Sequence, residues 1–286
     1  MQDVAPSIAI ADTPAGARPA KKRRGLRPSV FWAIREPTPR GLAISLPAGV
    51  SVLLLGSWIL LTTFGQIPAM FLPSPASVWT AFHTLMADGY GSDIVASLTR
   101  VAIGFSIAVL LSIPVGLLMG TFGTWESILA PMVGTLRYVP IPALVPLLIL
   151  WLGIDEAPKI AVIALATFFY NTIMVADGVR NVPRDFVNVS YTLGANRLDV
   201  LRRVILPAAM PQIIDALRVN IAVSFNFLFI AELVAADSGM GHRMEIAQRT
   251  NSSDQMFVGL IIIIIIGFVL DRLFRVAQRR LMPWHA

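Results

Sequence analysis

Six long apolar runs, separated by short polar segments, dominate the pattern of the chain. They fall at about residues 43–64, 94–120, 128–153, 158–176, 207–235 and 256–275. A helix needs roughly 20 apolar residues to cross a bilayer core of about 30 Å, so each run is long enough to span a membrane. The pattern therefore predicts an all-α, polytopic membrane helix bundle with six transmembrane helices, which leaves both ends of the chain on the same side.

The composition agrees with a membrane bundle. Hydrophobic residues make up 56% of the 286 positions and charged residues only 14%, against about 25% in typical soluble domains. The chain has no cysteine, which excludes disulfides, thiolate metal ligands and cysteine nucleophiles. A net charge of +6 would suit nucleic acid, but basic residues in a membrane protein usually reflect its topology. We therefore expect no nucleic-acid partner.

The distribution of lysine and arginine predicts the orientation. The N-terminal segment carries 8 of them, the segment 177–206 carries 5 and the segment after Leu270 carries 4. The segments on the opposite side, 65–92, 153–159 and 236–255, carry 0, 1 and 2. Cytoplasmic loops are enriched in basic residues, so both termini and the segment 177–206 are predicted to be cytoplasmic.

The sequence pattern divides the chain into a short N-terminal tail and a longer membrane domain. Residues 1–41 are rich in Ala, Pro, Lys and Arg, contain "KKRR" and have no apolar period, which predicts a disordered basic cytoplasmic tail. The basic cluster either marks the topology or binds anionic lipid. The first apolar run begins near Leu42, too late and too long for a cleaved signal peptide. Residues 42–286 form the predicted membrane domain.

Three local patterns add detail to the spans. "LPSPASVWTAF", in the outer segment 65–92, has Val78, Phe82 and Leu85 on one helical face and predicts a short helix at the outer interface. Gly116 and Gly120 form a GxxxG pattern, which favours close helix packing. Three prolines between residues 140 and 146 interrupt the third span, so its freed backbone groups must be satisfied inside the bundle or in a wet cavity.

The polar segment 181–206 lies between the fourth and fifth spans and predicts a helix, a turn and a second helix. Pro183 suits a first helical turn, Gly194 suits a helix end with positive φ, and Asn196 can cap the second helix. An apolar stripe runs along the first helix: Val182, Phe186, Val189 and Leu193. Two interpretations stay open. The arginines of this loop contact lipid headgroups, or the exposed stripe enters a groove on a partner.

This segment resembles the EAA signature of permease subunits of bacterial ABC importers. The signature is Glu-Ala-Ala, three residues, Gly, nine residues, Ile, one residue, Leu-Pro; here it reads Asn188-Val189-Ser190, Gly194, Val204-Ile205-Leu206-Pro207. Gly, Leu and Pro match in register. The chain departs from the signature at 188–190, where no glutamate is present to make the family's carboxylate contact.

More of the chain is similar to the nitrate, sulfonate, taurine and bicarbonate branch of these permeases. The similar segments are "FLPSPASVW", "LILWLGIDEAPKI", "LGANRLDVLRRVILPAAMPQI" and "FVGLIIIIIIGFVLDRL". Together they extend the resemblance over roughly residues 42–282. The combination is more specific than the loop motif alone.

The resemblance implies a mechanism and a set of partners. In that family the cytoplasmic helix pair is a coupling helix that inserts into a separate ABC ATPase subunit, and the permease works in the bacterial inner membrane as a dimer, here expected to be a homodimer. An extracytoplasmic substrate-binding protein delivers the solute, and the outer segment 236–255 is expected to be a gating element that meets it. The expected coupling contacts are Asn188, Ser190, Gly194, Ala195, Asn196, Arg197 and Leu198.

No cofactor is expected in this chain, because ATP and Mg would lie on the partner ATPase. The only lysines are Lys21, Lys22 and Lys159, and none follows the glycine spacing of a phosphate loop. Three histidines without ligand spacing give no reason to expect a metal site.

Polar residues inside the spans are candidates for a translocation path, because ionisable groups in a membrane are costly and often functional. The candidates are Arg137, Tyr138, Tyr170, Asn171, Asn220, Ser224, Asn226 and Glu232. The alternative for Asn and Ser is an interhelical hydrogen bond. Arg137 and Arg100 have a second interpretation as snorkelling side chains at the two interfaces, and Glu232 either gates the path or faces water.

Three classes of function are compatible with a bundle of this kind. An ABC importer permease agrees with the loop and the resemblance. A self-sufficient, ion-coupled secondary transporter would show two repeated halves, yet the 181–211 pattern has no second copy. An intramembrane protease lacks both His-Glu-x-x-His and Gly-x-Ser-x-Gly. For the substrate, the resemblance favours a small oxyanion or organosulfonate, although similar permeases carry aromatic acids and thiamine precursors.

Overall fold

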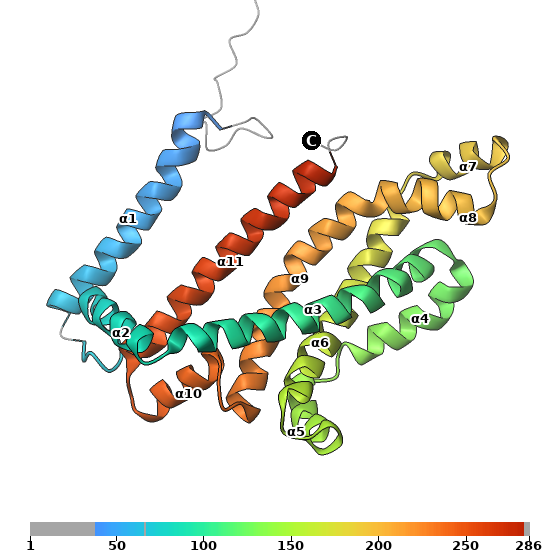
Figure 1. Ribbon diagram of the computed structural model, residues 1–286. Coiled ribbons are helices and arrows are strands. Elements are labelled where there is room, and N and C mark those ends of the chain that lie inside the picture. Colours follow the sequence, from blue (N-terminus) through green and yellow to red (C-terminus); the bar gives the residue numbers. More distant parts are fainter. Residues whose placement is uncertain (1–37, 66, 283–286) are drawn as a thin grey trace, which may run out of the picture. The chain divides into compact units, whose positions relative to one another are not determined.

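The computed structural model describes residues 38–65 and 67–282, and these residues form helices joined by short loops (Figure 1). In chain order the helices are α1 (Arg40–Phe64), α2 (Pro75–Ala87), α3 (Tyr90–Thr121), α4 (Gly123–Leu136), α5 (Ile141–Leu152), α6 (Glu156–Arg180), α7 (Arg184–Thr192), α8 (Arg197–Asp199), the π-helix η2 (Val200–Ile205), α9 (Leu206–Ala235), α10 (Met240–Arg249) and α11 (Ser253–Leu281). The all-α prediction is confirmed for this part of the chain.

Backbone contacts divide the chain into two units, Met1–Gly56 and Ser57–Ala286. The first unit contributes most of α1, an apolar helix with Pro47 inside it. Residues 1–37 of the predicted disordered tail, 1–41, lie outside the described residues. All sites considered below belong to the second unit.

Five described helical segments are long and apolar enough to cross a membrane: Gly41–Phe64, Tyr90–Thr121, Glu156–Arg180, Arg197–Val234 and Ser253–Arg280. The predicted interruption of the third span, 128–153, is confirmed, because the span is divided into α4 and α5, which meet at 94°. Pro140 stands at this break as the N-cap of α5. It has no N–H to donate, and it disfavours helical backbone at Val139 before it.

The two halves are short, since α4 has 14 residues and α5 has 12. At 1.5 Å per residue they reach only about 21 Å and about 18 Å, so neither crosses a bilayer core of about 30 Å alone. The predicted count of six spans therefore holds only when the bent pair is taken as one broken span.

The contact between α3 and α6 depends on the absence of side chains at two glycines. A Cβ on Gly116 would lie 2.7 Å from Cβ of Val175, and one on Gly120 would lie 2.6 Å from Cβ of Val179. The two helices therefore approach more closely than any larger residue allows. The close-packing interpretation of the GxxxG pattern is confirmed.

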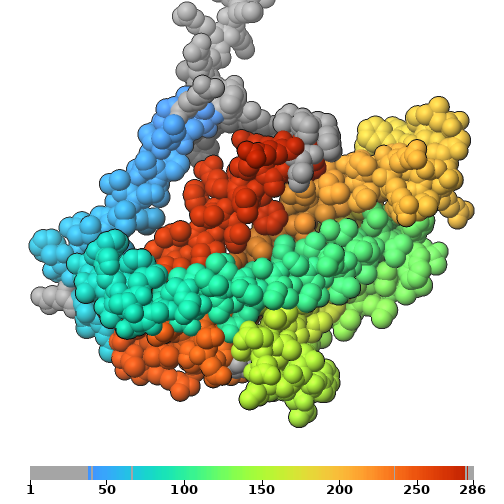
Figure 2. Space-filling view, in the orientation of Figure 1, coloured from blue at the N-terminus to red at the C-terminus, as the bar shows by residue number. Residues whose placement is uncertain are grey.

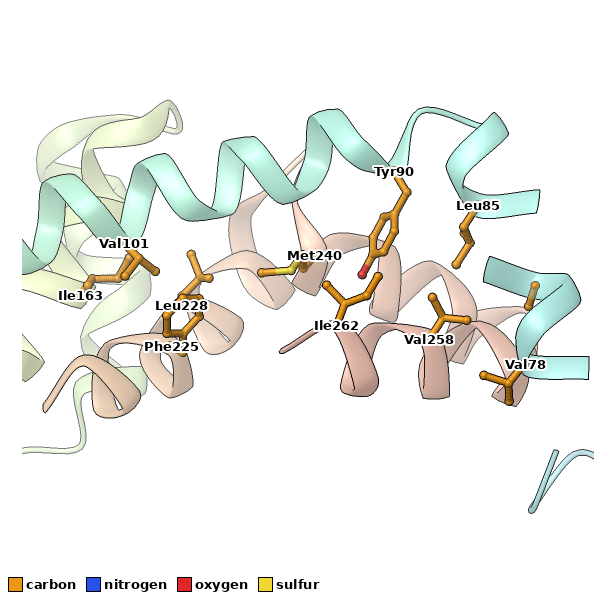
Figure 3. Packing of buried hydrophobic residues seen from close by; sticks show 11 residues of the cluster. Val78, Leu85, Tyr90, Val101, Ile163, Phe225, Leu228, Met240, Val258 and Ile262 are labelled. Carbon is orange, nitrogen blue, oxygen red and sulfur yellow. The ribbon is translucent and has the colours of Figure 1, made fainter. Parts of the chain in front are cut away.

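A hydrophobic cluster joins α2, α3, α6, α9, α10 and α11 within the second unit. In Figure 3, Tyr90 of α3 points toward Met240 of α10 and Ile262 of α11. The predicted interfacial helix is α2, and its N-cap Ser74 accepts a hydrogen bond from the Ser77 backbone N–H. Val78 and Leu85 of the predicted apolar face are buried in this cluster.

Helix α9 links the two regions that carry the candidate functional residues (Figure 1). It has 30 residues and is therefore about 45 Å long. The α7–α8 pair lies at its N-terminal end, joined to it through η2, and α10 follows its C-terminal end. In the space-filling view the α7–α8 pair, in yellow, projects beside the green residues of α3 and α4 (Figure 2).

Candidate functional site

Arg100 is the buried centre of an ion cluster at the C-terminal end of α9, in which Glu232 is buried and Glu156 is exposed. Its side chain is 3% exposed although it lies on a membrane-spanning helix. The guanidinium donates through Nε and Nη2 to the two carboxylate oxygens of Glu156, at 2.5 and 2.8 Å, and through Nη1 to Oε1 of Glu232 at 2.6 Å. Snorkelling of Arg100 to the outer interface is therefore wrong, because its charge is neutralised within the bundle.

Glu232 is fully buried and has hydrogen-bond donors at both carboxylate oxygens. Besides Arg100, the Ser97 hydroxyl donates to Oε1 at 2.7 Å, and the Gly241 backbone N–H donates to Oε2 at 2.8 Å. A buried carboxylate is tolerated when it is paired and its lone pairs are satisfied, and both conditions hold here. The interpretation that Glu232 faces water is wrong.

The connection from α9 to α10 is held by side chains of α3 and α9. The backbone N–H groups of Gly239, Met240 and Gly241 donate to Oδ1 of Asp93, Oγ of Ser97 and Oε2 of Glu232, at 2.8, 2.9 and 2.8 Å. Three successive donors at the start of a helix would otherwise lack partners. The α10 N-terminus is thus fastened directly to the ion cluster.

Gly239 allows this close approach. Its φ is +117°, and an added Cβ would lie 2.5 Å from Oε1 of Glu232 and 2.6 Å from Nη1 of Arg100. Arg100 also donates to the Ser238 carbonyl at 2.7 Å. Only glycine combines this backbone angle with the space available.

Two further cations complete the ion cluster. Arg243 of α10 donates to Oδ2 of Asp93 at 2.7 Å, and Lys159 of α6 donates to Oε1 of Glu156 at 3.0 Å. Three cations therefore face three carboxylates, and two of those cations belong to the segments that the orientation prediction places outside. Sequence reasoning missed Asp93 and Ser97, although Asp93 lies seven and Ser97 three residues ahead of Arg100, a spacing that puts all three on one face of α3.

A second polar cluster joins α6 to α9 midway along α9. The Asn220 amide donates to Oδ1 of Asn171 at 2.5 Å, and the hydroxyls of Thr167 and Ser224 lie 2.8 Å apart. All four side chains are buried. The structure thus brings three predicted path residues together, in the interhelical hydrogen bonds that were the alternative interpretation. Nδ2 of Asn171 has no hydrogen-bond partner among the described residues.

The other predicted path residues lie apart from these clusters. Arg137 and Tyr138 are exposed at the bend between α4 and α5, where the guanidinium donates to the Tyr138 hydroxyl at 3.1 Å and lies 5.0 Å from the ring centroid. Tyr170 and Asn226 are also exposed. The eight candidates therefore divide into buried residues that join helices of this chain and exposed residues on its surface.

The α7–α8 pair forms the helix, turn and helix expected over 181–206. Gly194 has φ +82° between the two helices, and the Asn196 carboxamide accepts from the backbone N–H groups of Leu198 and Asp199 at 3.0 and 2.9 Å. The Ala195 N–H donates to the Ser190 carbonyl at 3.0 Å. The positive φ and the side-chain cap together explain why the chain turns sharply at this point.

The two faces of the α7–α8 pair differ. Val187 and Ala195 pack against the core that α6, η2 and α9 share. The opposite face exposes three apolar side chains, Phe186, Val189 and Leu193, with exposed fractions of 54%, 56% and 82%. Of the predicted stripe only Val182 is packed inward. Asn188, Arg197 and Leu198 are exposed as well, whereas the Ser190 hydroxyl donates to the Phe186 carbonyl of its own helix at 2.6 Å.

Comparison with known proteins identifies the class of this chain. The profile of a family described as "Binding-protein-dependent transport system inner membrane component" matches residues 108–283. A probable ABC transporter permease protein of Brucella melitensis is 42% identical over 231 residues, which cover 80% of this chain and 93% of that protein. The taurine transport system permease protein TauC of Escherichia coli is 36% identical over 253 residues, which cover 86% and 92%.

A solved structure agrees on the fold. A chain of the MetNI methionine ABC transporter, in inward-facing conformations, superposes with a TM-score of 0.61 at 17% identity, covering 68% of this chain and 97% of that chain. The chain belongs to the family of binding-protein-dependent transport system inner membrane components, the permease subunits of ABC transporters. It is a multi-pass protein of the inner membrane, and the resemblance found in its sequence is confirmed.

Proposed function

We propose that this permease imports a small organosulfonate or a related oxyanion. The observation that carries the proposal is the 36% identity to the taurine permease, which extends over 86% of this chain and 92% of that protein. Taurine is a sulfonate, so the two proteins would share a substrate class. Selectivity would reside largely in the extracytoplasmic binding protein that delivers the solute.

The energy would come from two copies of a separate ABC ATPase, which would hold ATP and Mg. In support, the α7–α8 pair projects from the bundle and exposes Phe186, Val189 and Leu193. Apolar side chains at a tight turn suit a groove on a partner better than they suit water. The coupling contacts would be Asn188, Gly194, Arg197 and Leu198, with Ser190, Ala195 and Asn196 shaping the turn.

The translocation path would form between two copies of the chain. Three polar residues are exposed on this chain: Tyr138, Tyr170 and Asn226. A second copy would cover them, and they would then line the enclosed path. Asn171 and Asn220, in contrast, would hold α6 to α9 while the path opens alternately to the two sides. The ion cluster would keep the α9–α10 connection in place where the binding protein docks.

Reconstituted transport tests the proposal. The chain is co-expressed with a candidate ABC ATPase and a candidate binding protein, and the complex is placed in liposomes. Uptake of radiolabelled taurine is measured with ATP or ADP at the ATPase side, and with an imposed proton or sodium gradient. We expect uptake that requires ATP and the binding protein. Uptake driven by the ion gradient without ATP would instead favour the secondary transporter.

A matched pair of variants tests the coupling surface in the same assay. Leu193→Ser removes the most exposed side chain of the apolar face, whereas Thr192→Ala changes the neighbouring residue, whose hydroxyl bonds only to its own helix. We expect Leu193→Ser to weaken co-purification of the ATPase and ATP-dependent uptake, and Thr192→Ala to leave both unchanged. Equal co-purification of the two variants would place the ATPase contact elsewhere.

A further inference from the structure

A cavity of about 610 Å³ lies between the α7–α8 pair and the membrane-spanning helices. Its walls come from the turn between α3 and α4, the C-terminal end of α6, and the inner sides of α7, α8 and η2. All of these elements belong to the second unit of the chain. The cavity is separate from the ion cluster, which lies at the other end of α9.

The charged side chains that line this cavity are Arg180, Arg184, Arg197 and Glu126. Arg180 is neutralised, because it pairs with Glu126 at 2.8 Å and with Asp177 at 2.9 Å. Arg184 and Arg197 form no ion pair within the described part of the chain. Of the arginines that line the cavity, Arg184 of α7 and Arg197 of α8 are therefore the two without a carboxylate partner in the described chain.

Uncharged groups in the cavity also favour an anion. The Thr121 hydroxyl is enclosed at the wall and has no hydrogen-bond partner among the described residues. Phe122, the N-cap of α4, offers no side-chain acceptor to the first N–H groups of that 14-residue helix. Phe122 and Gly123 line the cavity, so the N-terminus of α4 opens into it, and Glu126 in the first turn of that helix is paired with Arg180.

We propose that this cavity binds a tetrahedral oxyanion, a phosphate or sulfonate group, between the guanidinium groups of Arg184 and Arg197. The Thr121 hydroxyl and the N-terminus of α4 would donate the remaining hydrogen bonds. The group has two possible sources, the headgroup of an acidic phospholipid and a free oxyanion on the same side of the membrane. An anion here would join α7 and α8 to the end of α3, whichever solute the permease carries.

The loop contains its own control for a general effect of positive charge. Arg202 and Arg203 lie on η2 and are exposed, as Arg184 and Arg197 are, but they do not line the cavity. A merely basic loop would lose binding equally when either pair is neutralised. A specific site in this cavity loses anion binding only when Arg184 and Arg197 are neutralised.

The test uses the full chain in nanodiscs of phosphatidylcholine, with radiolabelled sulfate as the probe and equilibrium dialysis as the measurement. The double variant Arg184→Gln/Arg197→Gln is expected to raise the Kd by about tenfold or more, because charge-assisted hydrogen bonds are lost. Arg202→Gln/Arg203→Gln should bind as the wild type does. Thermal unfolding of each variant verifies that it is folded.

Thr121→Val provides an independent variant. If the hydroxyl is merely an unsatisfied buried group, its removal leaves sulfate binding unchanged and leaves stability equal or higher. If it donates to the anion, sulfate binds about threefold or more weakly while the protein stays folded. Unchanged sulfate binding in this variant would remove Thr121 from the site.

The two sources are distinguished by adding phosphatidylglycerol to the nanodiscs. Loss of sulfate binding as the anionic lipid increases, or a thermal stabilisation by that lipid that only Arg184→Gln/Arg197→Gln abolishes, identifies a lipid headgroup. Sulfate binding that is indifferent to the lipid identifies a free oxyanion. The proposal is overturned if the two double variants give the same sulfate affinity and the same lipid-dependent stability. Neither readout depends on transport, so failure here leaves the proposed function intact.

Discussion

The two ends of α9 carry charge in opposite ways. At its C-terminal end the ion cluster has a buried centre, Arg100 and Glu232, its three cations face three carboxylates, and even the backbone N–H groups of α10 have partners there. At its N-terminal end the α7–α8 pair exposes apolar side chains and two arginines that pair with nothing in the described chain. The difference separates a region whose polar groups are paired within this chain from one whose exposed side chains are proposed to contact another molecule.

The largest expected effect is a loss of stability at the C-terminal end of α9, where the ion cluster lies. Arg100→Met leaves two carboxylates without their central cation, and breaking a buried ion pair in this way costs about 3–5 kcal/mol of unfolding free energy. The measurement is thermal unfolding of the chain in detergent, with Arg249→Gln as control, because Arg249 pairs with Glu245 on the surface. Arg100→Met/Glu232→Met should recover part of the loss. Equal melting of Arg100→Met and Arg249→Gln would contradict the cluster's role.

A second prediction concerns the backbone that passes over the ion cluster. Gly239→Ala places a Cβ 2.5 Å from Oε1 of Glu232 at φ +117°. We expect a loss of about 1–3 kcal/mol from strain at this site, again seen as a lower melting temperature. Gly267→Ala in α11 is the matched control, since no atom lies within 4 Å of its added Cβ. A Gly239→Ala protein as stable as Gly267→Ala would show that the connection adapts freely.

At the other end of α9 a similar substitution should have a different consequence. Gly194→Val must adopt φ +82° in open space, because nothing lies within 4 Å, and this costs about 1–2 kcal/mol confined to the turn. We expect stimulation of ATP hydrolysis by binding protein and solute to be lost while the bundle melts nearly as before. Gly194→Asn, which tolerates this φ, should retain coupling. Normal coupling in Gly194→Val would remove the turn from the ATPase contact.

The smallest effect concerns the polar cluster midway along α9. Asn220→Leu removes its hydrogen bond to Asn171, and hydrogen bonds between membrane helices average about 0.6 kcal/mol. Thermal unfolding should therefore change little, as for Asn226→Leu on the exposed surface. Uptake measurements then separate the roles of the two residues. If the path forms between two copies, Asn226→Leu lowers uptake and Asn220→Leu does not. Lower uptake in Asn220→Leu alone would place the path at Asn220.

The elements that could be predicted from sequence share one property, which is that neighbouring residues decide them. The outer helix 75–87, the turn at Gly194 and the cap at Asn196 follow from local backbone preferences and capping. The spans follow from apolar length, which each segment satisfies by itself. The break at Pro140 was only half predicted, because the proline indicates an interruption but gives no angle.

The ion cluster could not be predicted in the same way. Asp93, Ser97 and Arg100 share a helix face, yet nothing in their spacing identifies Glu156 or Glu232 as the partners, which lie 56 and 132 residues from Arg100. Taken singly, Arg100 was equally compatible with snorkelling. The same holds for the cavity, whose walls come from segments far apart in the sequence.

By itself, then, the sequence determined the spans, the protruding helix pair and the resemblance to permease subunits, and it predicts the orientation, because each depends on apolar length, local turns or charge counts. Only the tertiary structure decided which polar residues are neutralised inside the chain and which remain open to a partner. A charge within a membrane helix is costly until a partner is found, and that partner is set by the packing of α3, α6 and α9 rather than by its neighbours in the chain.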